Sequence, residues 1–225
     1  VTLGPVVRLW REARRLRRLP TDAERAAAMQ ASGYARLRLN ASDRSVTLLS
    51  PGMQLDLGGI AKGFAADEAL AVLARLGLVH AMVAASGDLA LGDAPPGTPG
   101  WKVEIAPFGY ASRGPLFVVA ANVGVSTSGD TEQFAEIGGV RYSHIINPAT
   151  ALGLTAPVAV TVIARHATLS DSLATACSVL AIGAGEQIAG CLGDSARAVV
   201  LRRDESGVVQ RETYGSDPPG LRTSL

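Results

Sequence analysis

Met53-Gln-Leu-Asp-Leu-Gly-Gly-Ile-Ala-Lys-Gly-Phe-Ala-Ala-Asp67 is the stretch of sequence that decides the fold around it. Apolar and polar side chains alternate over residues 53–57, which predicts a half-buried strand. Gly58 and Gly59 lack a Cβ, so the backbone can turn sharply there. From residue 61 the period becomes helical, and Gly77 is a natural helix end. The face predicted to be buried carries Ala65, Ala69, Val72, Leu73 and Leu76.

Lys62 falls in the first turn of this predicted helix. Unpaired N–H groups at a helix N-terminus attract anions, and the ammonium group adds a full positive charge. The turn is therefore a candidate anion site. The alternative is a tight strand-to-helix turn that binds no ligand. The glycine and lysine spacing of a Walker A loop is absent, so a P-loop is excluded.

The composition describes a globular protein with no general affinity for polyanions. The chain has 225 residues, 48% of them hydrophobic, and a formal net charge of +1. A balance this close to zero argues against a nucleic-acid or membrane-surface binder. No run of about 18 apolar residues is present, so no transmembrane segment is expected in this chain. Cys177 and Cys191 lack CxxC spacing, which favours two buried free thiols over a disulfide or a zinc site.

Strands occur in pairs and also alternate with helices along the chain, which indicates an α+β fold with a mixed or antiparallel sheet. Thr21 and Glu24 have the spacing of a capping box at a helix start. We expect one domain over residues 1–215 and a polar, disordered tail over 216–225. Predicted helices cover residues 5–18, 21–33, 61–76, 168–180 and 186–192, and predicted strands cover 34–40, 46–49, 81–85, 101–106, 116–122, 158–164, 196–201 and 208–210.

The first predicted helix is rich in arginine, and two interpretations are open. Its polar positions could form a phosphate or lipid patch, or an ordinary solvated helix face. Glu12 interrupts the basic run and no aromatic residues interleave with it, which favours the solvated face. The arginines concerned are Arg8, Arg11, Arg14, Arg15, Arg17 and Arg18.

Asp171 and Thr175 are four residues apart in a predicted helix, so both side chains project from one face. A carboxylate and a hydroxyl are hard oxygen ligands, which suit Mg²⁺. The alternative is structural: Asp171 would cap its own helix together with Thr168, and Thr175 would bond back to its own backbone.

His144 is one of three histidines and follows a predicted hairpin. Residues 126–130 form a hydroxyl-rich turn in which Ser128-Gly-Asp130 could orient this histidine for proton transfer. A structural role for His144 is the alternative.

These residues, taken in order, resemble the ApbE family, whose members are FAD:protein FMN transferases. The resemblance extends from Val1 to about Leu201 and implies the family's T-fold-like architecture. The motifs that carry it are Leu55-Asp-Leu-Gly-Gly-Ile-Ala-Lys-Gly-Phe-Ala-Ala-Asp67, Ser86-Gly-Asp-Leu89, Ser126-Thr-Ser-Gly-Asp130, His144-Ile-Ile-Asn-Pro148 and Asp171-Ser-Leu-Ala-Thr175.

The resemblance implies Mg²⁺-dependent transfer of FMN from FAD to a Thr or Ser hydroxyl of an acceptor flavoprotein, with AMP released. Phosphoryl-type transfer depends mainly on positioning and charge stabilisation, which a metal and a cation at a helix start provide. The roles implied by the resemblance are metal binding by Asp171, Thr175 and the Gly59 carbonyl, flavin-nucleotide contacts by Asp56 and Lys62, a backbone contact to FAD by Ile146, and proton transfer by His144.

Three positions depart from the family pattern: Asn147 replaces an aspartate, Ala149 a polar or basic residue, and Ala151 a glycine. The family also has an N-terminal segment with further FAD contacts, which we expect ahead of Val1, and a cell-envelope location. Two alternatives to the transferase therefore stay open. One is an FAD-binding module without transfer activity, and the other is a Mg²⁺-dependent FAD pyrophosphatase in which water replaces the acceptor hydroxyl.

Overall fold

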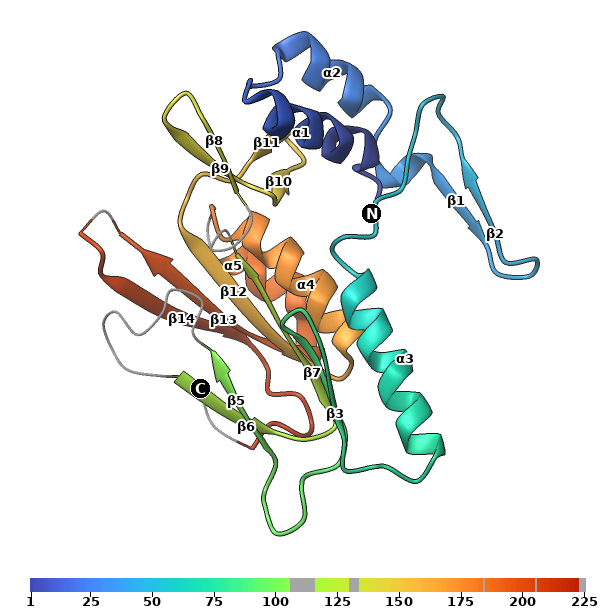
Figure 1. The fold of residues 1–225 in the computed structure, drawn as a ribbon, viewed down its shortest axis with the longest axis vertical. Helices are drawn as coiled ribbons and strands as arrows, with labels where there is room; N and C mark the ends of the chain where they lie inside the picture. The colour runs from blue at the N-terminus through green and yellow to red at the C-terminus, as the bar shows by residue number, and fades with distance from the viewer. Residues whose placement is uncertain (106–115, 130–133, 184, 205, 223–225) are drawn as a thin grey trace. The chain divides into compact units, whose positions relative to one another are not determined.

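The computed structural model describes residues 1–105, 116–129, 134–183, 185–204 and 206–222 (Figure 1). The chain divides into two compact units, unit 1 (residues 1–58 and 133–155) and unit 2 (residues 59–132 and 156–225). The α+β prediction is confirmed, and all pairs between the named strands of the described residues are antiparallel. The single domain predicted for residues 1–215 stays a prediction.

Unit 2 is built on a six-stranded sheet with the order β14-β13-β12-β7-β4-β3. Strand β12 lies inside the sheet and all seven of its residues are buried. A strand at these positions is predicted by the β-branched residues of the sequence. The sheet strands are β3 (Met82–Ala85), β4 (Asp88–Leu91), β7 (Val123–Gly129), β12 (Val158–Ala164), β13 (Ala196–Arg203) and β14 (Val209–Gly215).

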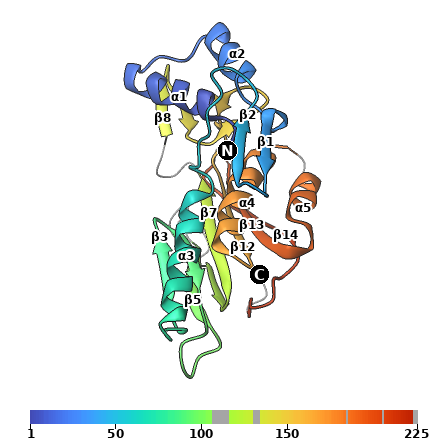
Figure 2. The same cartoon turned by 90° about the vertical axis from the view of Figure 1, so that its right-hand side faces the viewer.

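Helices cover one face of this sheet, and a hairpin packs against the other face. Helices α3 (Ala61–Arg75) and α4 (Ala167–Leu180) pack side by side (Figure 2), α4 against β7 and α3 against β3 and β4, and the short α5 (Glu186–Leu192) follows. Val160 and Val162 pack with Cys177 on the helical side. On the other side, Ile163 packs against hairpin β5 (Trp101–Ile105) and β6 (Leu116–Ala120).

Helix α3 begins where the sequence predicts, but it buries a different face. Gly63 and Ala66 are its buried residues, whereas Val72 is 44% and Leu76 71% exposed. A Cβ at Gly63 would lie 2.2 Å from the Ala167 carbonyl oxygen. The face with the smallest side chains is buried because it lets α3 approach α4 closely. The positions of the apolar residues alone therefore predict the wrong buried face.

The two neighbouring helices cap each other's N-termini. The Asp67 carboxylate on α3 accepts the backbone N–H groups of Ala167 (2.9 Å) and Thr168 (2.8 Å) at the start of α4. In return, Asp171 Oδ2 on α4 accepts the Gly63 N–H at 3.0 Å, in the first turn of α3. The capping box predicted for Thr168 and Asp171 is therefore wrong, because each carboxylate satisfies the other helix and not its own.

Unit 1 contains two helices and three hairpins. Trp10 is the centre of its core: the ring is buried, Nε1 donates to the Ala151 carbonyl at 2.8 Å, and the Tyr142 ring lies 5.2 Å away. The elements are α1 (Gly4–Leu16), α2 (Asp22–Gln30), the 3₁₀ turn η1 (Tyr34–Arg36), β1 (Leu37–Asn40), β2 (Ser45–Leu48), β8 (Phe134–Ile137), β9 (Val140–Ser143), β10 (Ile146–Asn147) and β11 (Leu152–Gly153).

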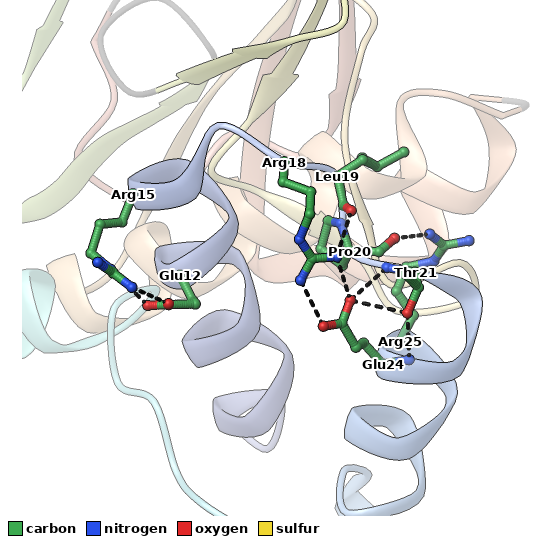
Figure 3. A network of polar contacts seen from close by, with 8 residues as sticks. All are labelled: Glu12, Arg15, Arg18, Leu19, Pro20, Thr21, Glu24 and Arg25. Atoms are coloured by element: carbon green, nitrogen blue, oxygen red, sulfur yellow. Dashed lines mark hydrogen bonds and ion pairs between the residues drawn. The ribbon is translucent and has the colours of Figure 1, made fainter.

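A polar network closes the α1–α2 connection (Figure 3). The predicted capping box is confirmed, with Thr21 Oγ1 accepting the Glu24 N–H and Glu24 accepting the Thr21 N–H. Hydrogen bonding to Arg18 and then to Thr21 lowers the pKa of Glu24 to about 2. Three of the six arginines of the predicted patch pair with carboxylates, as expected for a solvated helix face.

The strand predicted for residues 53–57 is wrong. Only Met53 is buried there, and Leu55 and Leu57 are 40% and 54% exposed. The Asp56 N–H donates to the Val1 carbonyl at 2.9 Å, and no β-ladder forms in this described segment. An alternating pattern gives a strand only where a partner strand is available, and none is provided here.

The described C-terminal residues pack against the rest of unit 2. The Arg222 N–H donates to the Val119 carbonyl at 2.8 Å, so the described part of the predicted tail is attached to β6. Within the described residues, no helix combines the length and hydrophobicity needed to cross a bilayer.

We expect Asp67→Ala to lower the free energy of unfolding by about 2 kcal/mol, because two N–H groups of α4 lose a charged acceptor. Urea unfolding measures the change. The exposed neighbour Glu68 provides a control, since Glu68→Ala should change stability by less than about 0.5 kcal/mol. Equal stability of the two variants would contradict the capping role of Asp67.

Candidate functional site

Unit 2 brings together the three residues predicted to bind a metal. Gly59 lies just before α3, and a Cβ built on it would be 3.2 Å from Thr175 Oγ1. Asp171 lies one turn before Thr175 on the same face of α4. A side chain at position 59 would therefore crowd the Thr175 hydroxyl, and a glycine lets the backbone lie close to it.

The oxygen atoms of these residues fit a hard cation. Asp171 is 2% exposed, and in the described part of the chain its one hydrogen bond is the contact of Oδ2 with the Gly63 N–H. One carboxylate oxygen, a hydroxyl and a backbone carbonyl are ligands that Mg²⁺ accepts while it keeps water or phosphate oxygens. The described residues contain no group of three His, Cys, Asp or Glu side chains suited to a metal. A site here would thus use a single carboxylate.

Both structural alternatives for this pair are contradicted. Asp171 makes no cap on its own helix: the N-cap residue His166 makes no side-chain cap bond, and the first N–H groups of α4 donate to Asp67 instead. The hydroxyl of Thr175 lies 3.1 Å from Ser128 Oγ and does not bond to a carbonyl of its own helix. Asp171 therefore does not cap its own helix, and Thr175 does not bond back to its own backbone, although their spacing permits both interactions.

Lys62 has a partner that the sequence does not reveal. Its ammonium group forms an ion pair with the carboxylate of Asp88, which is 2% exposed, while the Lys62 side chain is 43% exposed. Asp88 belongs to the Ser86-Gly-Asp-Leu89 motif and begins β4. A buried carboxylate needs such a cation, because desolvation without a partner is costly. The nucleotide contact expected of Lys62 stays a prediction.

Asp56 is a residue of unit 1, and both of its carboxylate oxygens are used. Oδ2 pairs with the guanidinium of Arg11 at 2.8 Å, and Oδ1 accepts the Gly58 N–H at 2.9 Å. The second bond fixes the start of the glycine turn. The flavin-nucleotide contact predicted for Asp56 is not tested by these interactions.

His144, also in unit 1, is exposed between two buried residues, Ser143 and Ile145. The Ser143 N–H donates to the Leu154 carbonyl at 2.7 Å, and the Leu154 N–H donates to the Ile145 carbonyl at 2.9 Å. The backbone on both sides of His144 is thereby fixed, while the residue itself is exposed. Its role in proton transfer stays a prediction.

The neighbouring positions that depart from the family pattern form a tight turn. Ile146 pairs with Gly153 across β10 and β11. Asn147 Oδ1 accepts the Ala149 N–H at 2.9 Å, an interaction that an aspartate could also make. Ala151 has φ of 55° in the left-handed region, where glycine is unstrained. The backbone geometry thus explains why a glycine suits position 151.

The prediction of a hydroxyl-rich turn over residues 126–130 is wrong for residues 126–129, which the structure describes. Residues 126–129 belong to β7, and Asp130 lies outside the described residues. Sequence analysis also missed the structural importance of Asp67 and Asp88. The alternation of Ser126 and Ser128 is a strand signal that could have identified this part of β7.

Cys177 is not a candidate nucleophile. Both cysteines are free, as predicted, and Cys177 is fully buried, whereas the burial predicted for Cys191 is wrong because that residue is only partly buried. Burial, with a smaller effect of Cys191, raises the pKa of the Cys177 thiol to about 12. Reactivity belongs to the thiolate, so this residue is inert near neutral pH.

Comparisons with known proteins agree on one family. The model of the ApbE family matches residues 1–199. An FAD:protein FMN transferase of Treponema pallidum is 36% identical over 193 residues, covering 79% of this chain and 53% of that protein. A transferase of the same name from Rhodobacter capsulatus is 36% identical over 172 residues, covering 76% and 32%. The chain thus spans about half or less of the length of these relatives.

Solved structures confirm the ApbE-like architecture. The flavin transferase ApbE of Vibrio cholerae superimposes with a TM-score of 0.79 at 26% identity, covering 96% of this chain and 68% of that one. The ApbE protein of Thermotoga maritima also gives 0.79, at 29% identity, with 94% and 68% covered.

We expect Lys62→Met to lower the free energy of unfolding by about 2 kcal/mol, because the buried Asp88 carboxylate loses its cation. In an Asp88→Asn background the same change should cost less than about 1 kcal/mol, since no charge is left unpaired. Urea unfolding of the four proteins in this double-mutant cycle gives both values. Additive losses would show that the two side chains act independently.

Proposed function

This chain belongs to the ApbE family, and on that basis we propose that it transfers FMN from FAD to a Thr or Ser hydroxyl of an acceptor flavoprotein. The observation that carries the proposal is the close approach of Gly59 to Thr175, one helical turn from Asp171. Neither local alternative for Asp171 and Thr175 holds: Asp171 bonds to the Gly63 N–H through one of its two oxygens, and the Thr175 hydroxyl pairs with Ser128, so neither side chain is bonded to its own helix.

Asp171, Thr175 and the Gly59 carbonyl are the proposed ligands of Mg²⁺. When bound, this ion neutralises negative charge that develops on the pyrophosphate of FAD. Asp171 contributes a negative charge from a buried position, and its bond from the Gly63 N–H fixes its orientation. Thr175 and Gly59 contribute neutral oxygens, so the site keeps net positive charge for the phosphates.

Four further residues are proposed to act on the organic substrates. Lys62 and Asp56 contact the flavin nucleotide, and Ile146 binds FAD through its backbone. His144 accepts the proton of the acceptor hydroxyl as the oxygen attacks the FMN phosphorus and the bond to the AMP phosphate breaks. An exposed residue on a fixed backbone suits this role, because a general base must reach a proton on a second protein.

The test is an incubation of the full natural chain with FAD, Mg²⁺ and an acceptor protein. We expect covalent FMN on a Thr or Ser of the acceptor by mass spectrometry, together with AMP. Release of free FMN and AMP without acceptor would instead establish the pyrophosphatase. Bound but unreacted FAD would establish a flavin-binding module.

Asp171→Asn separates metal binding from helix capping. The amide oxygen can still accept the Gly63 N–H, so we expect the free energy of unfolding to change by less than about 1 kcal/mol. The lost charge should abolish Mg²⁺-dependent transfer, measured at millimolar Mg²⁺. Ser172→Ala, on the next residue of α4, is the control. Wild-type transfer by Asp171→Asn would refute the metal assignment.

We expect His144→Ala to abolish transfer while Mg²⁺ affinity is retained. Asn147→Asp should preserve the bond to the Ala149 N–H and place a carboxylate near His144. A carboxylate favours the charged imidazolium and raises its pKa, so the free base appears at higher pH. The acidic limb of the rate profile should therefore move to higher pH. Normal transfer by His144→Ala would place the base elsewhere.

A further inference from the structure

Serine hydroxyls of β7 meet hydroxyls of α4 at two successive positions. Ser126 Oγ lies 2.8 Å from Ser170 Oγ, and Ser128 Oγ lies 3.1 Å from Thr175 Oγ1. Ser126 and Ser128 are roughly 6.6 Å apart along the strand, and Ser170 and Thr175 are about 7.5 Å apart along the helix axis. The two spacings are similar, so both hydroxyl pairs can form at once. Thr127, between the serines, faces away and bonds to Thr161 of β12 at 2.8 Å.

A threonine in a helix has two common side-chain orientations. In one of them, Oγ1 bonds back to a carbonyl of the preceding turn. Thr175 does not make that bond, because its hydroxyl pairs with Ser128. The contact with Ser128 on β7 therefore selects the Thr175 side-chain orientation in which Oγ1 points away from the backbone of α4.

The position of Ser128 is fixed by the strand pairing of β7. Ser128 pairs with Val160 in the register between β7 and β12. Its carbonyl lies 3.4 Å from the hydroxyl of Ser178 in the next turn of α4, although that hydroxyl makes its shorter bond, 2.9 Å, to the Ala174 carbonyl. The hydroxyl of Ser128 therefore projects from an interior strand of the sheet and not from a loop.

We propose that Ser128 is a positioning residue for the Thr175 ligand: it accepts the Thr175 hydroxyl proton and leaves the oxygen lone pairs of Thr175 for the cation. A hydroxyl has one proton and two lone pairs, so an oxygen that binds a metal must direct its proton elsewhere. Partners of this kind commonly change metal affinity 10- to 100-fold. This inference rests on the metal site of the proposed function.

The test measures Mg²⁺ affinity by calorimetry on the full natural chain, without FAD. We expect Ser128→Ala to weaken Mg²⁺ binding about tenfold or more, and Ser128→Thr to restore it, because threonine keeps the hydroxyl. Ser126→Ala is the matched control: it removes a hydroxyl contact between the same strand and helix, but to a residue with no ligand role. Its Mg²⁺ affinity should remain within about twofold of wild type.

Thr175→Ala completes the design. This variant should weaken Mg²⁺ binding, and adding Ser128→Ala to it should have no further effect, because the ligand to be positioned is gone. Weakened binding by Thr175→Ala with wild-type affinity in Ser128→Ala would overturn the Ser128 inference alone. Equal losses in Ser126→Ala and Ser128→Ala would also overturn it, since helix docking would then be the cause. Wild-type affinity in Thr175→Ala would overturn the metal site itself.

Discussion

The reciprocal capping of α3 and α4 is the interaction on which unit 2 depends. Asp67 satisfies the first N–H groups of α4, and Asp171 satisfies an N–H group in the first turn of α3. Each bond joins a charged acceptor to a helix end, where the partial positive charge of the dipole strengthens it. The two N-termini are thus fixed to each other, and the glycine turn before α3 is fixed with them.

Small residues make this arrangement possible. A Cβ at Gly63 would collide with the Ala167 carbonyl, and one at Gly124 of β7 would lie 2.3 Å from the Ala167 Cα. The start of α4 is therefore enclosed by glycine on two sides, from α3 and from the sheet. Close packing of backbone against backbone brings Gly59 to Thr175, so the candidate metal site follows from the packing of the two helices.

Lys62 combines an ion pair with an accessible side chain. Lys62 at the start of α3 neutralises the buried Asp88, and Asp171 keeps one oxygen outside its bond to Gly63. A lysine tied to a buried carboxylate has a defined position, and almost half of its side chain remains accessible. Its structural role and an electrostatic role toward a phosphate are therefore compatible.

The sequence by itself determined the α+β class, the start of α3, the capping box of α2 and the strand β12, because each depends on local periodicity or on neighbours within four residues. Ordered motifs also identified the family. Tertiary structure alone decided which face α3 buries, that residues 53–57 form no strand, and that Lys62 pairs with Asp88. These outcomes depend on which backbone segments approach each other. Periodicity in the sequence does not show that Lys62 meets Asp88, 26 positions away, or that Gly63 meets Asp171, 108 positions away.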